Sequence, residues 1–268
     1  MKRRCVLVAA VVAVVVLAAS APSLADDKQL QNQKGSVSYQ IPNGKPVPLG
    51  VNATIGLADR DFAITGGSSL AQILLPDSSG VLVGSDTRVQ LAFFNQTQIA
   101  TANFVVYQGR VRFAVRHPHG AQANYTFKTA TGSVGVRGTQ GDIEYDSSGA
   151  LRVNVYELCD PNAPVEVTTK GGKTYSVAAG QTLLAQLVNG VVRTEVQSLT
   201  QQLINQFSPD FGVPTSWDAA KGEVIGYGTS AVNSVTNGYG SEVASTITSV
   251  FGKKKTAPSP GPTPTTCS

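Results

Sequence analysis

The two histidines of the chain stand close together in His117-Pro118-His119, so they are the first candidates for chemistry. Two imidazoles at this spacing could share a metal ion on one face of a strand. Pro118 and the following Gly120 instead indicate a turn between strands, and no Cys, Asp or Glu lies nearby in the sequence. We interpret both as solvated loop histidines, and we predict neither a metal site nor a cofactor.

Sequence signatures of common catalytic sites are missing. There is no nucleophile elbow, no Walker loop and no dinucleotide fingerprint. Two Gly-Tyr-Gly segments, at 226–228 and 238–240, lack the lysine and the strand-to-helix setting of a phosphate loop. The 17 acidic residues leave a carboxylate pair for glycoside chemistry open, but nothing singles out two of them. We therefore predict that the chain is not an enzyme.

Three arginines form a second candidate site. In residues 109–116, which read Gly-Arg-Val-Arg-Phe-Ala-Val-Arg, the basic and apolar side chains alternate. Arg110, Arg112 and Arg116 should therefore project from one face of a strand whose other face enters a core. Two interpretations stay open: an ordinary solvated face, or a positive strip that binds an anionic glycan such as cell-wall polymer or lipopolysaccharide.

Period-two alternation extends well beyond this strand, from Gly35 to about Leu187. Turn signals recur about every ten residues, at 43–44, 66–67, 79–80, 148–149 and 171–172. Charged residues make up only 14% of the chain, which suits short strands and turns better than a charged helical bundle. The expected fold is all-β, either a two-sheet sandwich or a short β-solenoid of many short strands.

The pattern changes near Thr194. Val196, Leu199, Leu203 and Phe207 fall at spacings of three and four, which predicts an amphipathic helix that ends before Pro209. Helical spacing returns from 232 to 250, and a run of lysines and prolines follows. The predicted segments are a signal peptide at 1–25, a linker at 26–34, a β domain at 35–190, a helical extension at 194–252 and a disordered tail at 253–268.

The first residues have the three parts of a secretory signal peptide. A basic start is followed by an apolar stretch at 6–19, and Ser23-Leu24-Ala25 offers a small-residue cleavage site. The apolar stretch would reach only ~21 Å as a helix, short of a ~30 Å hydrocarbon core. We therefore expect cleavage after Ala25, no stable membrane span afterwards, and a periplasmic or secreted product.

The net charge of +4 comes from the two ends of the chain. Three basic residues lie at 2–4 and three more at 253–255, and without them 15 basic residues face 17 acidic ones. No basic face is implied, so we predict no nucleic-acid partner.

Signal cleavage would remove Cys5 and leave Cys159 and Cys267. An oxidising compartment permits a disulfide between them. The alternative is a half-buried Cys159 and a mobile thiol at Cys267 in the proline-rich tail.

One segment of the β region has a distinctive sequence. In residues 132–139, Gly-Ser-Val-Gly precedes Val136-Arg137-Gly138-Thr139. We expect Val134 and Val136 in the core, Gly138 at a positive φ or a close backbone approach, and Thr139 bonded to a neighbouring backbone group as it restarts the strand.

With this segment, residues 35–187 resemble the FecR domain, an extracytoplasmic domain named after the regulator of ferric citrate uptake. Further matching segments are 35–37, 71–82, 108–111 with Gly109 opening a central strand, 127–129 and 180–181. The resemblance implies an all-β domain outside the cytoplasmic membrane. In the best-known members it relays a signal from an outer-membrane receptor to a sigma factor.

In those members a cytoplasmic segment and a spanning helix precede the β domain, whereas here a signal peptide is expected. We therefore expect a binding or scaffold module of the bacterial cell envelope that recognises a protein or glycan through its sheet surface. The alternative is a signalling module that relays iron-uptake receptor status to a membrane anti-sigma partner. Arg137 is expected either to pair with Asp142 or Glu144 or to face the partner.

Overall fold

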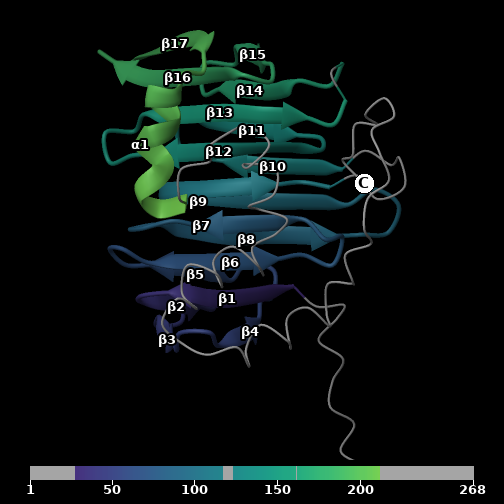
Figure 1. The fold of residues 1–268 in the computed structure, drawn as a ribbon, viewed down its shortest axis with the longest axis vertical. Helices are drawn as coiled ribbons and strands as arrows, with labels where there is room; N and C mark the ends of the chain where they lie inside the picture. The colour runs from purple at the N-terminus through teal and green to yellow at the C-terminus, as the bar shows by residue number, and fades with distance from the viewer. Residues whose placement is uncertain (1–27, 117–122, 161, 212–268) are drawn as a thin grey trace, which may run out of the picture.

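A computed structural model describes residues 28–116, 123–160 and 162–211 (Figure 1). Within them the chain forms 17 strands and one helix, and the strands stack along the long axis of the molecule. The all-β prediction is confirmed.

The strands form two layers. The first, sheet A, has the spatial order β4 (Thr54–Gly56), β1 (Gln29–Lys34), β6 (Leu70–Leu74), β7 (Gly80–Val83), the second half of β9 (Thr101–Ala114), β12 (Thr139–Tyr145), β13 (Leu151–Leu158), β16 (Gln181–Val188) and β17 (Val191–Ser198). The second, sheet B, has the order β3 (Val47–Leu49), β2 (Val37–Gln40), β5 (Phe62–Thr65), β8 (Arg88–Asn95), the first half of β9, β10 (Asn124–Lys128), β11 (Gly132–Val136), β14 (Val165–Thr169) and β15 (Thr174–Val177).

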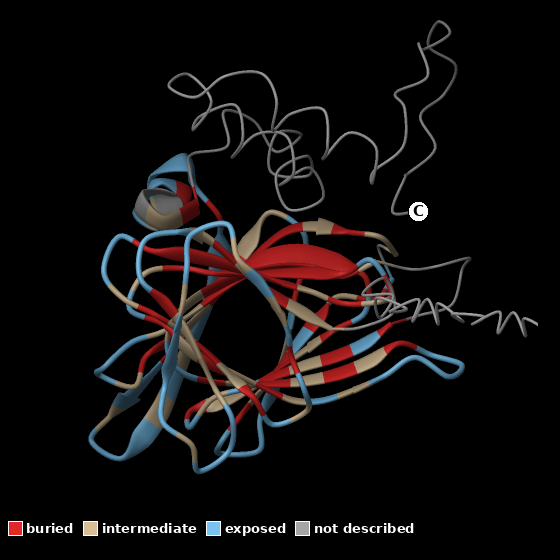
Figure 2. Cartoon of the chain, turned by 90° about the horizontal axis from the view of Figure 1, so that it is seen from below, coloured by how far each residue is buried: buried red, intermediate tan, exposed pale blue. Residues whose placement is uncertain are grey.

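Successive hairpins alternate between the two sheets, so the sandwich is wound in the manner of a short solenoid. All strand pairs are antiparallel except β9 with β10, which makes the arrangement mixed. The long strand β9 belongs to both sheets and joins them into one unclosed network. Viewed along the stack, buried residues concentrate on the strands and exposed residues on the connecting turns (Figure 2).

Alternating side chains fill the space between the layers. One buried cluster extends from Leu30 on β1 to Ala185 on β16. Near its middle, the Phe127 ring lies 5.0 Å from the Phe104 ring and 5.2 Å from the Phe113 ring, centroid to centroid. The period-two pattern thus places the apolar side chains as expected, because one face of each strand meets the other sheet.

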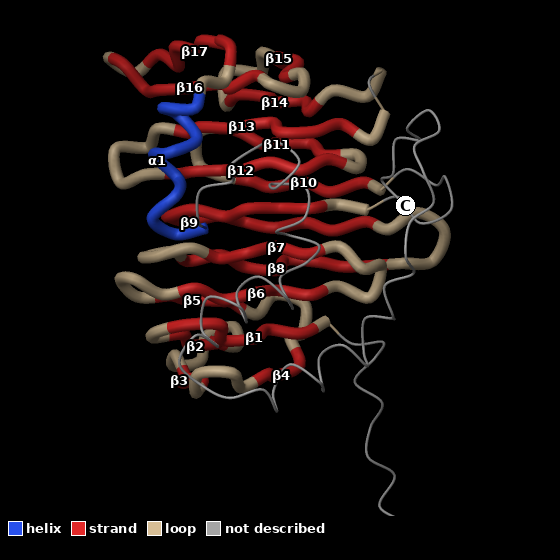
Figure 3. Tube along the Cα trace, viewed as in Figure 1, coloured by secondary structure: helices blue, strands red, loops and turns tan. Residues whose placement is uncertain are grey.

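The helix α1 (Gln201–Phe211) lies in front of sheet A (Figure 3). Thr200 caps its first turn, since the Thr200 Oγ1 accepts a hydrogen bond from the Leu203 backbone N–H at 3.3 Å. Two buried clusters hold it to the sheet, one containing Phe211 and Leu82, the other Ile204 and Tyr156.

Three expected boundaries are corrected. Residues 194–198 belong to β17, not to a helix, because residues 181–198 form an unbroken antiparallel hairpin. The helix then continues past Pro209 to Phe211. Residues 29–34, expected as linker, form β1 and pair with β4 and β6. The expected signal peptide, the helical region beyond 211 and the tail lie outside the described residues.

Candidate partner-binding site

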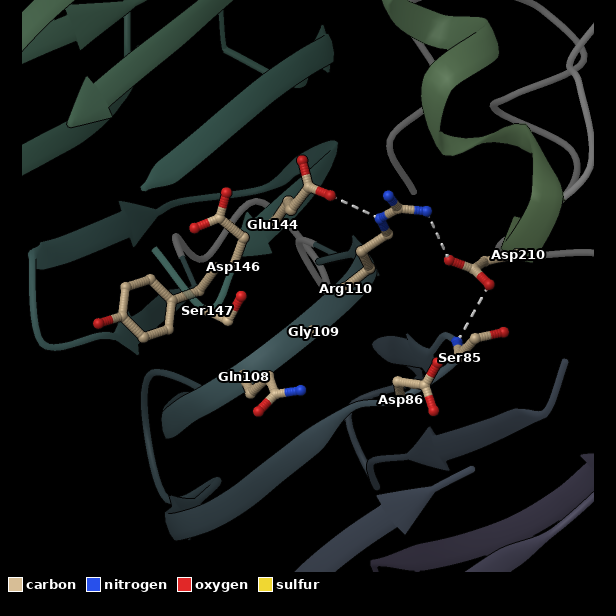
Figure 4. Close-up of a pocket in the computed structure, with 10 residues that line it drawn as sticks. Ser85, Asp86, Gln108, Gly109, Arg110, Glu144, Asp146, Ser147 and Asp210 are labelled. Atoms are coloured by element: carbon tan, nitrogen blue, oxygen red, sulfur yellow. Dashed lines mark hydrogen bonds and ion pairs between the residues drawn. The ribbon is translucent and has the colours of Figure 1, made fainter. Parts of the chain in front are cut away.

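A shallow notch of about 250 Å³ lies where β9 passes from one sheet to the other (Figure 4). Polar side chains from four neighbouring parts of the fold surround it. The lining residues are Ser85, Asp86, Gln108, Gly109, Arg110, Glu144, Tyr145, Asp146, Ser147 and Asp210.

Gly109 makes this crossing possible. Its φ is +97°, and a Cβ there would lie 2.2 Å from the Thr87 Oγ1. That hydroxyl accepts the Arg110 backbone N–H at 2.8 Å and so fixes the chain just after the bend. Gly109 was expected to open a strand, but it lies within β9, at the point where the strand changes sheets.

Arg110 is the centre of the notch. Its Nε donates to the Glu144 Oε1 at 2.7 Å, and its Nη1 donates to the Asp210 Oδ2 at 3.0 Å. Burial alone would lower the pKa of Arg110, but hydrogen bonds and charge from Glu144 and Asp210 raise it above its ordinary value. The register between β9 and β12 explains the ion pair with Glu144, because Arg110 lies directly opposite Glu144 in this strand pair.

Asp210 connects the helix to this site. Its second oxygen, Oδ1, accepts the Ser85 backbone N–H at 3.1 Å, and its side chain is only 4% exposed. One carboxylate on α1 therefore bridges β9 and the chain after β7.

Asp146 closes the turn between β12 and β13 on the opposite side of the notch. Burial would raise its pKa, but hydrogen bonds from Ser148 and from the Ala150 backbone N–H lower the pKa below its ordinary value. Its negative charge is therefore well stabilised.

The notch has an acidic balance. Its lining residues include four carboxylates, of Asp86, Glu144, Asp146 and Asp210, and one guanidinium, that of Arg110, while the charge of Arg152 also acts on Asp146. Asp86 and Asp146 are exposed. Such a surface suits a basic side chain from a partner better than an anion.

A buried polar network lies next to the notch, beneath α1. The Arg112 guanidinium holds the Asp142 carboxylate with two hydrogen bonds, of 2.7 and 3.1 Å, and both side chains are at most 1% exposed. Tyr156 donates its O–H to the same carboxylate, and the Phe211 ring lies 4.9 Å from the Arg112 guanidinium carbon. Burial, followed by the charge of Asp142, raises the pKa of Tyr156 above its ordinary range.

These contacts correct both interpretations of the arginine row, because Arg112 is buried and therefore lies neither on a solvated face nor on an accessible positive strip. Arg110 and Arg112 lie on one face as predicted, but carboxylates neutralise both of them. Arg116, at the end of the row, is half-buried, and its backbone N–H donates to the Ser79 Oγ at 3.0 Å.

The distinctive segment at 132–139 has a structural role. Val134 and Val136 are fully buried, and Gly138 has a φ of +85°, as expected. Thr139 begins β12, and its backbone oxygen accepts the Val115 N–H. Its hydroxyl, expected to bond the backbone, has no hydrogen-bond partner within the described residues.

Arg137 has a different partner from those expected. Its Nη2 lies 3.7 Å from the Glu166 Oε2 on β14, and about half of each side chain is exposed. Asp142 and Glu144 are instead taken by the arginines of β9.

Two further predictions concern cysteine and metal. Cys159 is disulfide-bonded, and the bond partner lies outside the described residues. His117 and His119 also lie outside them. Among residues 28–116, 123–160 and 162–211, no cluster of three or more His, Cys, Asp and Glu could hold a metal ion.

The acidic members of the notch were not predicted as site residues. Glu144 could have been found by extending the alternation of β12 opposite β9, since the facing pair Arg110–Glu144 is a common cross-strand pair. Asp210 gave no such signal, because it is 100 residues from Arg110 in the sequence.

One family model and two solved structures match parts of the chain. Residues 61–157 match the family model described as FecR protein. Two crystal structures of a candidate anti-sigma factor from Parabacteroides distasonis share 16% and 15% identity with the chain, with TM-scores of 0.42 and 0.43. They cover 53% and 54% of this chain, which spans 62% and 64% of theirs, less than two thirds of their length. No curated protein matches the sequence.

The described helix is far too short to cross a membrane, and no other helix is described in the residues searched.

Proposed function

We propose that this chain, whose residues 61–157 match the family model described as FecR protein, is an exported, non-catalytic module that binds a protein partner in the bacterial cell envelope and takes part in signalling there. The acidic notch is the observation that supports a protein partner. A basic segment of a protein complements four carboxylates around one arginine, whereas an anionic glycan would be repelled at this face.

The notch also supports a binding role over a catalytic one. Glu144 and Asp210, its two least exposed carboxylates, both serve to neutralise Arg110. A catalytic carboxylate pair flanks its substrate from two sides, whereas these two groups enclose a guanidinium.

Site-specific photocrosslinking in cells tests the proposed site. A photoreactive residue replaces Gln108, which is exposed at the notch, and the matched control replaces Gln98, which is exposed in the turn between β8 and β9. We expect a protein adduct at position 108 and little at position 98, and the adduct should weaken at higher salt. Equal adducts at both positions, or none at 108, would contradict the proposal.

The identity of the adduct separates the two forms of the function. A receptor of the outer membrane or a membrane anti-sigma protein supports the signalling module, and a structural envelope protein supports a scaffold. Export is tested separately by N-terminal sequencing, which should give Asp26 as the first residue of the mature chain.

A further inference from the structure

The strand β17 forms an unusually open edge of sheet A. In the described part of the chain it pairs only with β16, over eight residues without a bulge. The other three edge strands are short: β3 and β4 have three residues each, β15 has four, and β3 contains Pro48. Short strands and proline protect sheet edges from further pairing, and β17 lacks both protections.

Hairpin geometry shows which backbone groups face this open edge. The turn between β16 and β17 has Asn189 and Gly190 at φ +52° and +80°, typical of a two-residue hairpin whose flanking residues exchange hydrogen bonds. Since bonding alternates along an antiparallel pair, the odd-numbered residues bond to β16. The bond from the Leu199 N–H to the Gly180 oxygen, at 2.8 Å, agrees with this parity. The N–H and C=O groups of Val192, Thr194 and Val196 therefore point outward.

The sequence of β17 is complementary to itself in the antiparallel direction. With Thr194 at the centre, positions 193 and 195 face each other, and so do positions 192 and 196. The first pair is Arg with Glu, and the second is Val with Val. We propose that a second copy of this chain occupies the edge, with the two β17 strands paired antiparallel about a two-fold axis at Thr194.

Each contact in this arrangement has a physical basis. Arg193 faces Glu195 of the partner subunit at a position between hydrogen-bonded pairs, where cross-strand side chains lie closest. Two-fold symmetry forms this ion pair twice. Val196, 36% exposed, gains contact with Val192 of the partner subunit.

The Thr194 side chain is compatible with an axis at this position, since threonines at facing positions can hydrogen-bond to each other. Its Oγ1 is buried and has no hydrogen-bond partner within the described residues, so a rotation about χ1 would be needed to turn it toward Thr194 of the partner subunit.

Charge reversal tests the pairing on the full chain. Arg193→Glu alone and Glu195→Arg alone each place like charges opposite each other twice, so each should raise the dimer dissociation constant about tenfold or more. The double variant Arg193→Glu with Glu195→Arg restores both pairs and should restore dimerisation. Analytical ultracentrifugation measures the constants, and non-reducing gels exclude disulfide-linked dimers. A monomeric wild type, or a double variant as weak as the single ones, overturns the proposal.

Amide hydrogen exchange provides a second readout with an internal control. The amides of Arg193 and Glu195 bond to β16 and should be protected at every concentration. The amides of Val192, Thr194 and Val196 should become protected only as the dimer forms. If these three amides are protected in a monomer, residues 212–268 of the same chain are the better occupant, and the second-copy proposal fails.

Discussion

At the scale of single residues, Gly109 has the strictest requirement, because it combines a positive φ with a close backbone approach. We expect Gly109→Ala to lower the free energy of unfolding by about 3 kcal/mol or more, since its Cβ would lie 2.5 Å from the Thr87 Cα. Urea denaturation followed by circular dichroism measures the change. Gly172→Ala is the matched control: φ is +79° with no atom within 4 Å of the added Cβ, so the expected loss is only about 1–2 kcal/mol. Equal losses would show that the approach to Thr87 is unimportant.

Buried tyrosines lead to a prediction about alkaline pH. Tyr125 is fully buried and donates to the Asp77 Oδ2 at 2.6 Å, and burial together with the charge of Asp77 raises the pKa of Tyr125 far above its unfolded value of about 10. A raised pKa means that the unfolded chain loses this proton first. The contribution of the Tyr125 hydroxyl to the free energy of unfolding is therefore fully present below pH 10. Above pH 10 this contribution falls by about 1.4 kcal/mol per pH unit.

The variant Tyr125→Phe checks this dependence. Its stability at neutral pH should fall, because the buried Asp77 loses a donor. Above pH 10 the free energy of unfolding of this variant should fall less steeply with pH than that of the wild type. The two slopes should differ by about 1.4 kcal/mol per pH unit, the value for one proton. Parallel slopes in urea titrations of the two proteins would contradict the assignment.

The arginine partners show the limit of prediction from sequence at this scale. Alternation placed Arg110 and Arg112 on one face correctly, since side-chain direction along a strand is local information. Their ion pairs are not local, because Asp142 lies 30 residues from Arg112 and the register of β9 with β12 brings them together. The sequence-based prediction named Asp142 and Glu144 as possible ion-pair partners, but it assigned them to Arg137. The register of β9 with β12, which decides their actual partners, is not visible in the sequence.

At the scale of elements, α1 depends on a small apolar contact with sheet A. Ile204 is 3% exposed and packs with Tyr156 and Leu199. We expect Ile204→Ala to cost about 2 kcal/mol and to speed hydrogen exchange in α1 more than in the strands. Gln202→Ala, on the exposed side of the helix, should change stability by less than about 0.5 kcal/mol. If exchange in α1 were unchanged by Ile204→Ala, the ion pairs of Asp210 would be the dominant attachment.

The misplaced start of the helix has a physical explanation. Val196 and Leu199 lie three positions apart, which fits a helix, yet Val196 also lies on the alternating face of β17. Short apolar runs are ambiguous between the two periods, and pairing with β16 decides the outcome. Element type was therefore predictable over most of the β region, whereas the boundary between β17 and α1 depended on tertiary contacts.

At the scale of the whole molecule, alternation of hairpins between the two sheets creates a continuous core. One cluster contains residues from β1 through β16, and β9 contributes to both layers. Because a single buried cluster extends along the stack, the two ends should lose their structure together.

This continuity predicts cooperative unfolding, which Phe104→Ala can test. Phe104 is fully buried in the middle of the stack, and its loss should cost about 3–5 kcal/mol. Far-UV circular dichroism reports the sheets and near-UV circular dichroism reports the buried tyrosines, and both transitions should shift together. Phe93→Ala, at a 39% exposed position on β8, is the matched control and should cost less than about 1 kcal/mol. If the two probes separated in the Phe104 variant, the ends of the stack would be independent units, and β9 would not couple the two sheets energetically.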